Sequence, residues 1–357
     1  MSPQIRRRSL LVGAAGAAFG APLILGRRAA ADERSITVGI YTGLQGDVVR
    51  KQIIPPFEAK HDCKVYTTQG VTLEQIALMR ASRNNPKYSV MFVDDIGVAL
   101  AKNEGLIERL PAEQIPSMER VLKRFIFYEG FGVAFAMSAA GLAYNNVTGR
   151  PLESYGDLWD PKLKGRFLME TPKATQSLYL LIAAVSVVTS RPYHEAQYWI
   201  DSAWPKMEAL KPNVLSIFDT DATVMQVAQG QADVAGLFYS KSVNPYTMQG
   251  APIAMCYPKE GTFAGINTVT LVKNCPEREL ATAFIDWMLS PATQQLLAEQ
   301  TLTAPSLFGL SFKPEAEKYM AYPESKMDEM GIFSPDWSFI NPMRSHLIER
   351  YNEVFGA

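Results

Sequence analysis

Cysteine and histidine are scarce in this sequence, which has three of each among 357 residues. No Cys-x-x-Cys occurs and the histidines stand singly, so a zinc site or a Cys/His catalytic pair has no support in spacing. We therefore expect no bound metal. Three cysteines allow one disulfide at most, and Cys256 with Cys275 is the favoured pair.

Neither sign of charge is in excess, because 35 lysines and arginines stand against 36 aspartates and glutamates. Nucleic-acid-binding proteins carry a clustered basic excess, so nucleic acid is excluded as a partner. With 47% hydrophobic and 20% charged residues, the composition is typical of a globular chain. At roughly 100–200 residues per domain, the length predicts two domains.

The motifs of nucleotide-binding and nucleophilic enzymes are missing as well. No predicted strand leads into GxGxxG or GxxxxGK[ST], so no nucleotide cofactor is expected. No Ser/His/Asp or Cys/His grouping has the local signature of a nucleophile with its base. We expect a protein without cofactor or catalytic residues, and therefore not an enzyme.

The first 31 residues differ from the rest, with five arginines and no acidic residue. A basic segment containing Arg7-Arg8 precedes an apolar stretch at 10–25, and alanines fill 29–31. This order predicts an export signal at 1–31, cleaved before Asp32, and the paired arginines favour the twin-arginine route over the general one. A membrane anchor is the alternative, but the apolar stretch is short for a span of about 20 residues. The mature protein is expected in the periplasm.

Short β-rich runs alternate with helical patterns along the mature chain. Near its start we predict strands at 35–41, 63–68 and 89–93 and helices at 47–60, 73–83 and 96–104. This alternation indicates βαβ units and a mostly parallel sheet in an α/β fold. A second unit is predicted with strands at 131–137, from 141, and at 166–170, 214–218, 234–239 and 268–272, and with helices at 175–189, 195–210, 222–229, 277–289 and 291–299.

Polar residues follow the first three predicted strands. They are Tyr41-Thr42-Gly43, Gln69 and the pair Asp94-Asp95. Because ligands of parallel sheets bind at the carboxyl ends of the strands, we expect these residues at a solute site. Aspartate also caps helices well, so one of the two aspartates is expected to cap the helix from Ile96 while the other faces the solute.

Five motifs then occur in a fixed order: KNEGLI at 102–107, LWDPKLKG at 158–165, KPNV at 211–214, YPKEG at 257–261 and FIDWMLSP at 284–291. Together with PDWSFIN at 335–341, this set resembles the periplasmic spermidine/putrescine-type solute-binding proteins of ABC importers. The resemblance covers essentially all of the mature chain. It implies the two-lobed type II periplasmic binding fold, with lobe 1 at 36–137 and 268–310, lobe 2 at 138–267 and 311–357, and a cleft that closes on the solute.

The resemblance also implies contacts from the second lobe, at Thr175, Gln176, Ser177, Tyr239 and Asn267. In the polyamine-binding members a carboxylate follows the Pro-Lys-Glu-Gly turn, whereas the corresponding residue here is the neutral Asn267. A dication held by neutral groups loses charge-assisted hydrogen bonds of about 1.5–3 kcal/mol each. We therefore expect a small polar or zwitterionic solute, amino-acid-like or opine-like, in place of a linear polyamine.

In that interpretation Asp94 or Asp95 binds an ammonium group of the solute, and Lys173 or Lys241 binds a carboxylate. The expected partners are the solute and an inner-membrane ABC permease, and a monomer is expected. Two alternatives remain open. One is a transport protein of the same fold that binds ferric ion or an anion, although the adjacent tyrosines typical of ferric-ion carriers are missing from the sequence. The other is an exported enzyme on this fold.

Overall fold

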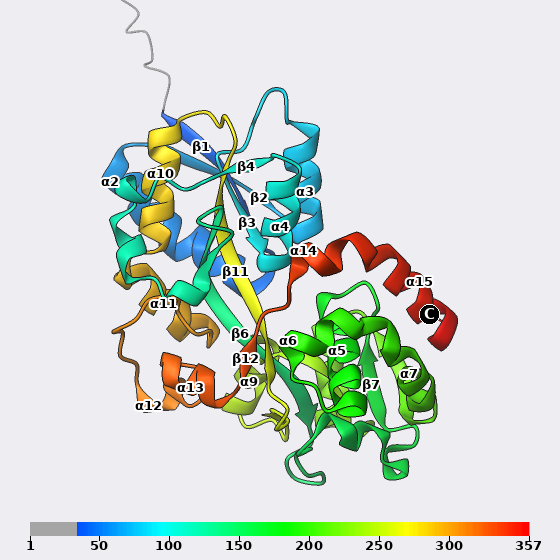
Figure 1. Cartoon of the computed structure of the whole chain (residues 1–357). Helices are drawn as coiled ribbons and strands as arrows, with labels where there is room; N and C mark the ends of the chain where they lie inside the picture. The colour runs from blue at the N-terminus through cyan, green and yellow to red at the C-terminus, as the bar shows by residue number, and fades with distance from the viewer. Residues whose placement is uncertain (1–33, 357) are drawn as a thin grey trace, which may run out of the picture. The chain divides into compact units, whose positions relative to one another are not determined.

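One mixed sheet runs through residues 34–356, which are the residues that the computed structural model describes (Figure 1). Its twelve strands include a main path in the order β2-β1-β3-β11-β6-β9-β7-β8. The strands of this path are β1 (Ser35–Ile40), β2 (Lys64–Gln69), β3 (Val90–Asp94), β6 (Gly132–Tyr144), β7 (Phe167–Glu170), β8 (Val214–Phe218), β9 (Val234–Tyr239) and β11 (Thr262–Val272). Short strands pair beside it: β4 (Ile107–Glu108), β5 (Ile126–Phe127), β10 (Ala254–Cys256) and β12 (Ile332–Phe333).

Parallel strands form both ends of this sheet. β1 pairs in parallel with β2 and β3 at one end, and β7 pairs in parallel with β8 and β9 at the other. Between them, β11 and β6 run antiparallel to their neighbours on the main path. The predicted α/β class is confirmed, and the parallel groups expected in the two lobes are the two ends of one continuous sheet.

Strand β6 differs from its prediction. The sequence predicted one strand at 131–137 and a second one from 141, but β6 is continuous over Gly132–Tyr144. The intervening Ser138-Ala139-Ala140 are small residues that pair with Gly265, Ala264 and Phe263 of β11. This pairing also explains why β11 begins at Thr262, earlier than the predicted residue 268.

The helices cover the two faces of the sheet, as alternate residues of β3 illustrate. Phe92 belongs to a core that includes Phe57 and Phe284, and Met91 faces a separate core that includes Met79. Alternation of this kind is expected for a strand buried on both faces. The helices are α1 (Gly43–Val48), α2 (Ile54–His61), α3 (Thr72–Ala81), α4 (Asp95–Asn103), α5 (Thr175–Thr189), α6 (Tyr193–Ala196), α7 (Trp204–Leu210), α8 (Val224–Ala228), α9 (Ser240–Met248), α10 (Arg278–Met288), α11 (Pro291–Thr301), α12 (Pro314–Glu317), α13 (Glu324–Glu329), α14 (Trp337–Ile340) and α15 (Arg344–Phe355).

The single helix predicted at 195–210 is wrong. Trp199 has φ −118° and ψ 24°, which interrupts the helix, and α7 starts anew at Trp204 with Pro205 in its first turn. Proline has no backbone N–H and is tolerated at the first turn of a helix, so it marks a new start there.

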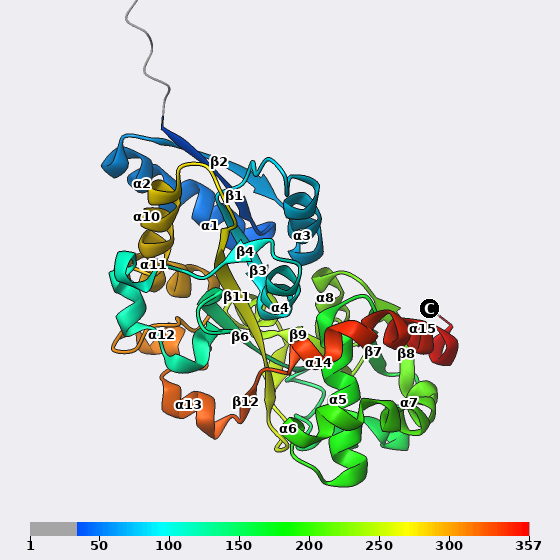
Figure 2. The same cartoon turned by 45° about the horizontal axis from the view of Figure 1, so that its top comes forward.

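We call β1, β2 and β3 with the elements packed on them the first half of the sheet, and β7, β8 and β9 with theirs the second half. The C-terminal segment packs on the second half. Figures 1 and 2 both show α14 beside α4 and α15 beside α7. Trp337 of α14 and Tyr351 of α15 are buried in the core that contains α5, and the rings of Tyr351 and Trp204 meet edge to face at 5.5 Å. Met320 and Met327, in contrast, lie in the core of the first half. The lobe boundaries remain a prediction.

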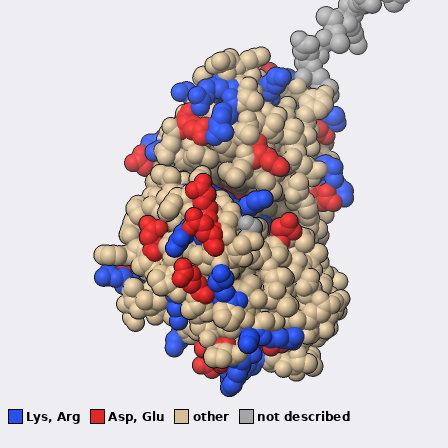
Figure 3. Space-filling model, turned by 90° about the vertical axis from the view of Figure 1, so that its right-hand side faces the viewer, with Lys and Arg blue, Asp and Glu red and all other residues tan. Residues whose placement is uncertain are grey.

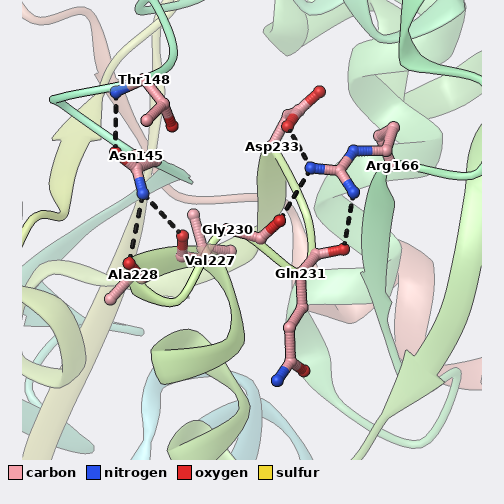
Figure 4. Close-up of polar contacts among 8 residues, drawn as sticks. All are labelled: Asn145, Thr148, Arg166, Val227, Ala228, Gly230, Gln231 and Asp233. Atoms are coloured by element: carbon pink, nitrogen blue, oxygen red, sulfur yellow. Dashed lines mark hydrogen bonds and ion pairs between the residues drawn. The ribbon is translucent and has the colours of Figure 1, made fainter.

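Side-chain hydrogen bonds hold the backbone at the end of α8 and in the loop that follows it (Figure 4). Asn145 Nδ2 donates to the carbonyl oxygens of Val227 and Ala228 at 3.0 and 3.2 Å, which satisfies backbone groups at the end of the helix. The Arg166 guanidinium binds the carbonyl oxygens of Gly230 and Gln231 and the carboxylate of Asp233. These bonds fix the entry into β9, whose far end reaches the site described below.

No disulfide joins any two of Cys63, Cys256 and Cys275, so the favoured Cys256–Cys275 pairing is wrong. Cys256 is buried in the core beneath α5, while Cys275 packs at the edge of the first half. The predicted export signal at 1–31 lies outside the described residues. No helix within residues 34–356 is long and apolar enough to cross a membrane.

Candidate functional site

A cavity of about 690 Å³ lies where the carboxyl ends of β1, β3 and β9 come together. Asp94 is the last residue of β3 and Tyr239 is the last residue of β9. β1 and β3 are parallel to each other, whereas β9 runs in the opposite direction, because β11 and β6 between them are antiparallel to their neighbours. The carboxyl ends of the two parallel groups therefore approach the middle of the sheet from opposite sides, which is how residues far apart in sequence meet. Of the residues predicted to contact the solute, six line this cavity: Tyr41, Thr42, Gly43, Asp94, Tyr239 and Asn267.

Two donors hold the Asp94 carboxylate through one of its oxygens. Tyr41 Oη and Asn267 Nδ2 both donate to Oδ1, each at 2.9 Å. The backbone N–H of Asp94 donates to Thr72 Oγ1 at 2.9 Å, which ties it to the start of α3. No residue in the described part of the chain donates to Oδ2. A solute ammonium group therefore has an acceptor at Asp94 Oδ2.

Asn267 links Asp94 to a positively charged side chain. Its Oδ1 accepts a hydrogen bond from Lys241 Nζ at 3.2 Å while its Nδ2 donates to Asp94. The pairing of β11 with β6 shifts register between Asn267 and Thr268, a local irregularity that redirects neighbouring side chains. Thr268 Oγ1 donates to the Val93 carbonyl oxygen at 2.6 Å. One amide thus joins a carboxylate and an ammonium group in the same cavity.

The Tyr239 ring packs against the backbone of β11. A Cβ atom on Gly265 would stand 2.2 Å from Tyr239 Cε1, so the close approach requires glycine. Lys241 Nζ lies 5.8 Å from the centre of the same ring. Burial, followed by the negative charge of Asp94, raises the pKa of both Tyr239 and Tyr41 well above the usual range. Both phenols are neutral at physiological pH.

A second cavity, of about 510 Å³, adjoins the first and shares Val71, Thr72 and Asp94 with it. Thr175, another predicted contact, lines it together with Lys173 and Arg344. Figure 3 views the side on which α15 lies and shows a hollow with basic and acidic side chains near its rim. The two cavities together form the candidate cleft.

Three predicted residues lie elsewhere. Gln69 is exposed, and its Nε2 lies 3.5 Å from the carbonyl oxygen of Tyr41. Gln176 and Ser177 are buried in α5, where Ser177 Oγ donates to the backbone carbonyls of Pro172 and Ala174. None of the three lines either cavity. Their role as solute contacts remains a prediction.

Asp95 is separated from the cleft although it follows Asp94 directly. It is only 1% exposed, and its Oδ2 accepts hydrogen bonds from Ser334 Oγ at 2.5 Å and Trp337 Nε1 at 2.8 Å. The capping interpretation of the pair is wrong, because Asp94 occupies the N-cap position of α4 without a side-chain capping bond. Asp95 joins the start of α4 to the C-terminal segment instead.

Sequence reasoning missed several residues that line the cleft: Thr72, Tyr246, Gln249, Thr301 and Arg344. Thr72 could have been found, because it opens the helix after the turn at Gly70 and so stands at a predicted strand end. Arg344 has no comparable signal, since it begins α15 about 250 residues after β3 and reaches the cleft only through tertiary packing.

Among the described residues, the charged side chains that line the two cavities are one carboxylate, Asp94, and three cations, Lys173, Lys241 and Arg344. Anions are therefore favoured near the cations, and a single cationic group is favoured at Asp94. Among residues 34–356 no group of three or more His, Cys, Asp and Glu residues is placed to hold a metal ion.

Comparison with known proteins gives the same picture of the fold. An ABC transporter substrate-binding protein from Bradyrhizobium japonicum has a similar structure, with a TM-score of 0.77, 18% identity, and coverage of 90% of this chain and 99% of that one. A spermidine/putrescine-binding periplasmic protein of Haemophilus influenzae is 24% identical over 270 residues, 73% of this chain and 72% of that protein. Iron uptake protein A2 of Synechocystis is 23% identical over 357 residues, 94% of this chain and 97% of that protein.

The predicted two-lobed periplasmic binding fold is confirmed by this structural likeness. The family model for bacterial extracellular solute-binding proteins matches residues 52–324, which is most of the chain. The protein therefore belongs to the bacterial extracellular solute-binding protein family.

Proposed function

We propose that this protein is the periplasmic component of an ABC importer and that it captures a small zwitterionic organic solute of the amino-acid or opine type. It delivers this solute to an inner-membrane permease. The observation that carries the proposal is the chain of contacts from Asp94 through Asn267 to Lys241 in one cavity. A zwitterion matches it, with its ammonium at Asp94 Oδ2 and its carboxylate at Lys241.

A linear polyamine fits this lining poorly. A diamine needs an anionic or strongly accepting partner at each end, whereas the described residues of the lining include one acid and three bases. A second cation would lie near Lys241 or Arg344, and like charges that are poorly screened repel one another. The relative from Haemophilus influenzae is named for spermidine and putrescine, and we infer that the solute of the present chain differs from those.

Transport of ferric ion is the second candidate, because the Synechocystis relative is named an iron uptake protein. Tyrosine binds ferric ion as the phenolate. In this chain the Tyr41 hydroxyl donates to Asp94 Oδ1, and within residues 34–356 no group of three or more His, Cys, Asp and Glu residues is placed to hold a metal ion. The geometry therefore favours the organic solute.

The proposed mechanism is closure of the cleft. Contacts come from the first half of the sheet at Asp94 and from the second half at Tyr239 and Lys241. A solute that binds residues of both halves stabilises the closed state, and the permease recognises that state.

A ligand screen tests the proposal. The mature protein is purified, any bound compound is released by denaturation and identified by mass spectrometry, and thermal stability is measured with amino acids, opines, sugars, spermidine and putrescine. A ligand at 100 times its Kd stabilises by about 2.7 kcal/mol, which a thermal shift detects. We expect shifts with zwitterions and none with polyamines. A shift confined to polyamines, or visible absorbance with ferric ion, would overturn the proposal.

A further inference from the structure

Two cations, Lys173 and Arg344, line the second cavity, and Asp94 is the one acid among the described residues of its lining. Arg344 lines it and donates from Nη2 to the Lys173 carbonyl oxygen at 2.7 Å. Within the described chain, no carboxylate lies within ion-pair distance of Arg344 or Lys173. Burial lowers the pKa of Arg344, and the nearby Tyr239, Tyr179 and Asp94 act in the opposite direction. A half-buried guanidinium held in place by a backbone carbonyl is suited to bind an anion.

The remaining walls of this cavity are largely apolar. Val71 and Leu73 are 54% and 51% exposed, although both are large hydrophobic residues at the start of α3. They line the cavity together with Ile96, Leu100 and Ile348. Contact with a hydrocarbon group would remove this apolar surface from water. The cavity therefore combines an apolar wall with a cationic end.

From this arrangement we infer that the second cavity binds a second anionic group of the same solute, connected to the amino-acid head by an apolar spacer. The inference rests on the proposed function, because the head occupies Asp94 and Lys241. The two cavities share Asp94, Thr72 and Val71, so one molecule can reach from one to the other. The solute class is an amino acid with a terminal carboxylate or phosphonate-like group, and Arg344 is the residue that selects it.

Three probes separate the terminal group from the rest of the molecule. Norleucine has the amino-acid head and an apolar tail, 2-aminopimelate adds a carboxylate to that tail, and 2-amino-6-phosphonohexanoate adds a phosphonate at the same carbon. Affinities are measured by calorimetry on the mature protein. We expect either diacid to bind about 10- to 100-fold more tightly than norleucine, as a charge-assisted hydrogen bond provides. The two diacids then show whether carboxylate or phosphonate is preferred.

Substitution of Arg344 identifies the residue responsible. Arg344→Gln should remove the advantage of the diacids and leave the affinity for norleucine unchanged. Arg344→Lys should keep part of the diacids' advantage, since the positive charge stays but the two parallel hydrogen bonds of a guanidinium are lost. Arg350→Gln is the matched control, because Arg350 lies on the same helix and pairs with Glu208 and Glu353 at the surface. It should change none of the affinities.

Failure of this inference differs from failure of the proposed function. If norleucine and both diacids bind equally well, the second cavity selects no anion and the inference is wrong, while the proposed function stands. An equal loss of affinity for all three probes in Arg344→Gln would assign Arg344 a structural role and overturn the inference too. If no zwitterion binds the unaltered protein, the proposed function itself fails.

Discussion

The indole nitrogen of Trp337 donates a hydrogen bond of 2.8 Å to Oδ2 of Asp95, across 242 positions of sequence. Ser334 donates to the same oxygen at 2.5 Å. The adjacent Asp94 shares no partner with Asp95 and lies in the cleft. Two neighbouring carboxylates therefore perform separate tasks, and substitutions at the two positions should have separable effects.

Asp94→Asn should weaken solute binding and change stability little. The substitution removes the negative charge that binds the ammonium group, with a cost of at least about 1 kcal/mol, a roughly fivefold increase in Kd. Calorimetric titration with the compound recovered from the purified protein measures the effect. Asp95→Asn serves as the control, since that side chain is outside the cleft, and unchanged affinity in Asp94→Asn would remove the carboxylate from the site.

Asp95 should make folding stability depend on pH. Burial raises the pKa of Asp95 to about 7 from its usual 3.8 and outweighs the bonds from Ser334 and Trp337 that favour the carboxylate. Between these pH values the folded state holds more protons than the unfolded state, so stability falls as pH rises from about 4 to about 7. Asp95→Asn should abolish this component, which amounts to up to about 4 kcal/mol.

Chemical denaturation of the unaltered protein and of Asp95→Asn at several pH values measures that component as the difference between them. The control is Asp47→Asn, because Asp47 is a surface carboxylate paired with Arg50 and Lys51. A difference between the unaltered protein and Asp95→Asn that stays constant with pH would contradict the prediction.

Gly265→Ala should disturb the site through Tyr239. The added methyl group would overlap the ring, which has to move, and overpacking of this kind typically costs about 1–3 kcal/mol. Lower thermal stability together with weaker solute binding is expected. Gly156→Ala is the comparison, because its Cβ would stand 3.1 Å from the Ser154 hydroxyl and Gly156 does not line either cavity. Normal binding in Gly265→Ala would show that the position of the Tyr239 ring does not matter.

The three cysteines should react slowly in the native protein, Cys63 because it is buried. Burial raises the pKa of Cys256 and of Cys275 to about 11, so little thiolate is present at neutral pH. Iodoacetamide should therefore react slowly with the native protein at pH 7.5 and add three groups after unfolding. A mass two units lower before reduction, or a melting temperature lowered by reductant, would reveal a disulfide.

Export should remove residues 1–31. Intact-mass measurement of periplasmic protein is expected to give an N-terminus at or near Asp32, because the basic, apolar and small-residue segments occur in the required order. Lysine substitution of both Arg7 and Arg8 should stop export if the twin-arginine route is used. A mature protein that retains Arg6 would exclude cleavage at this site.

Much of the fold could be predicted because it depends on local signals. The ranges 175–189, 214–218 and 234–239 agree with α5, β8 and β9 at both ends, since each has a marked helical or β-rich pattern. The first half of β11 was missed because Gly265 and Asn267 are poor strand formers. Pairing with β6 overrides that local preference.

The site was predictable where it lies at strand ends. Asp94 and Tyr239 follow directly from that rule, and Asn267 came from the family resemblance. Arg344 could not be inferred, because only the packing of α15 brings it to Lys173. The separation of Asp94 from Asp95 likewise depends on Trp337, which no local pattern connects to β3.

The continuous sheet has a consequence for folding. β11 lies between β3 and β6, so a strand from late in the chain separates two earlier ones. Separation of the sheet between β3 and β11 would leave unpaired backbone N–H and C=O groups on both strands. The two ends of the sheet should therefore lose their structure in one cooperative transition, and neither should be recovered as an autonomous folding unit.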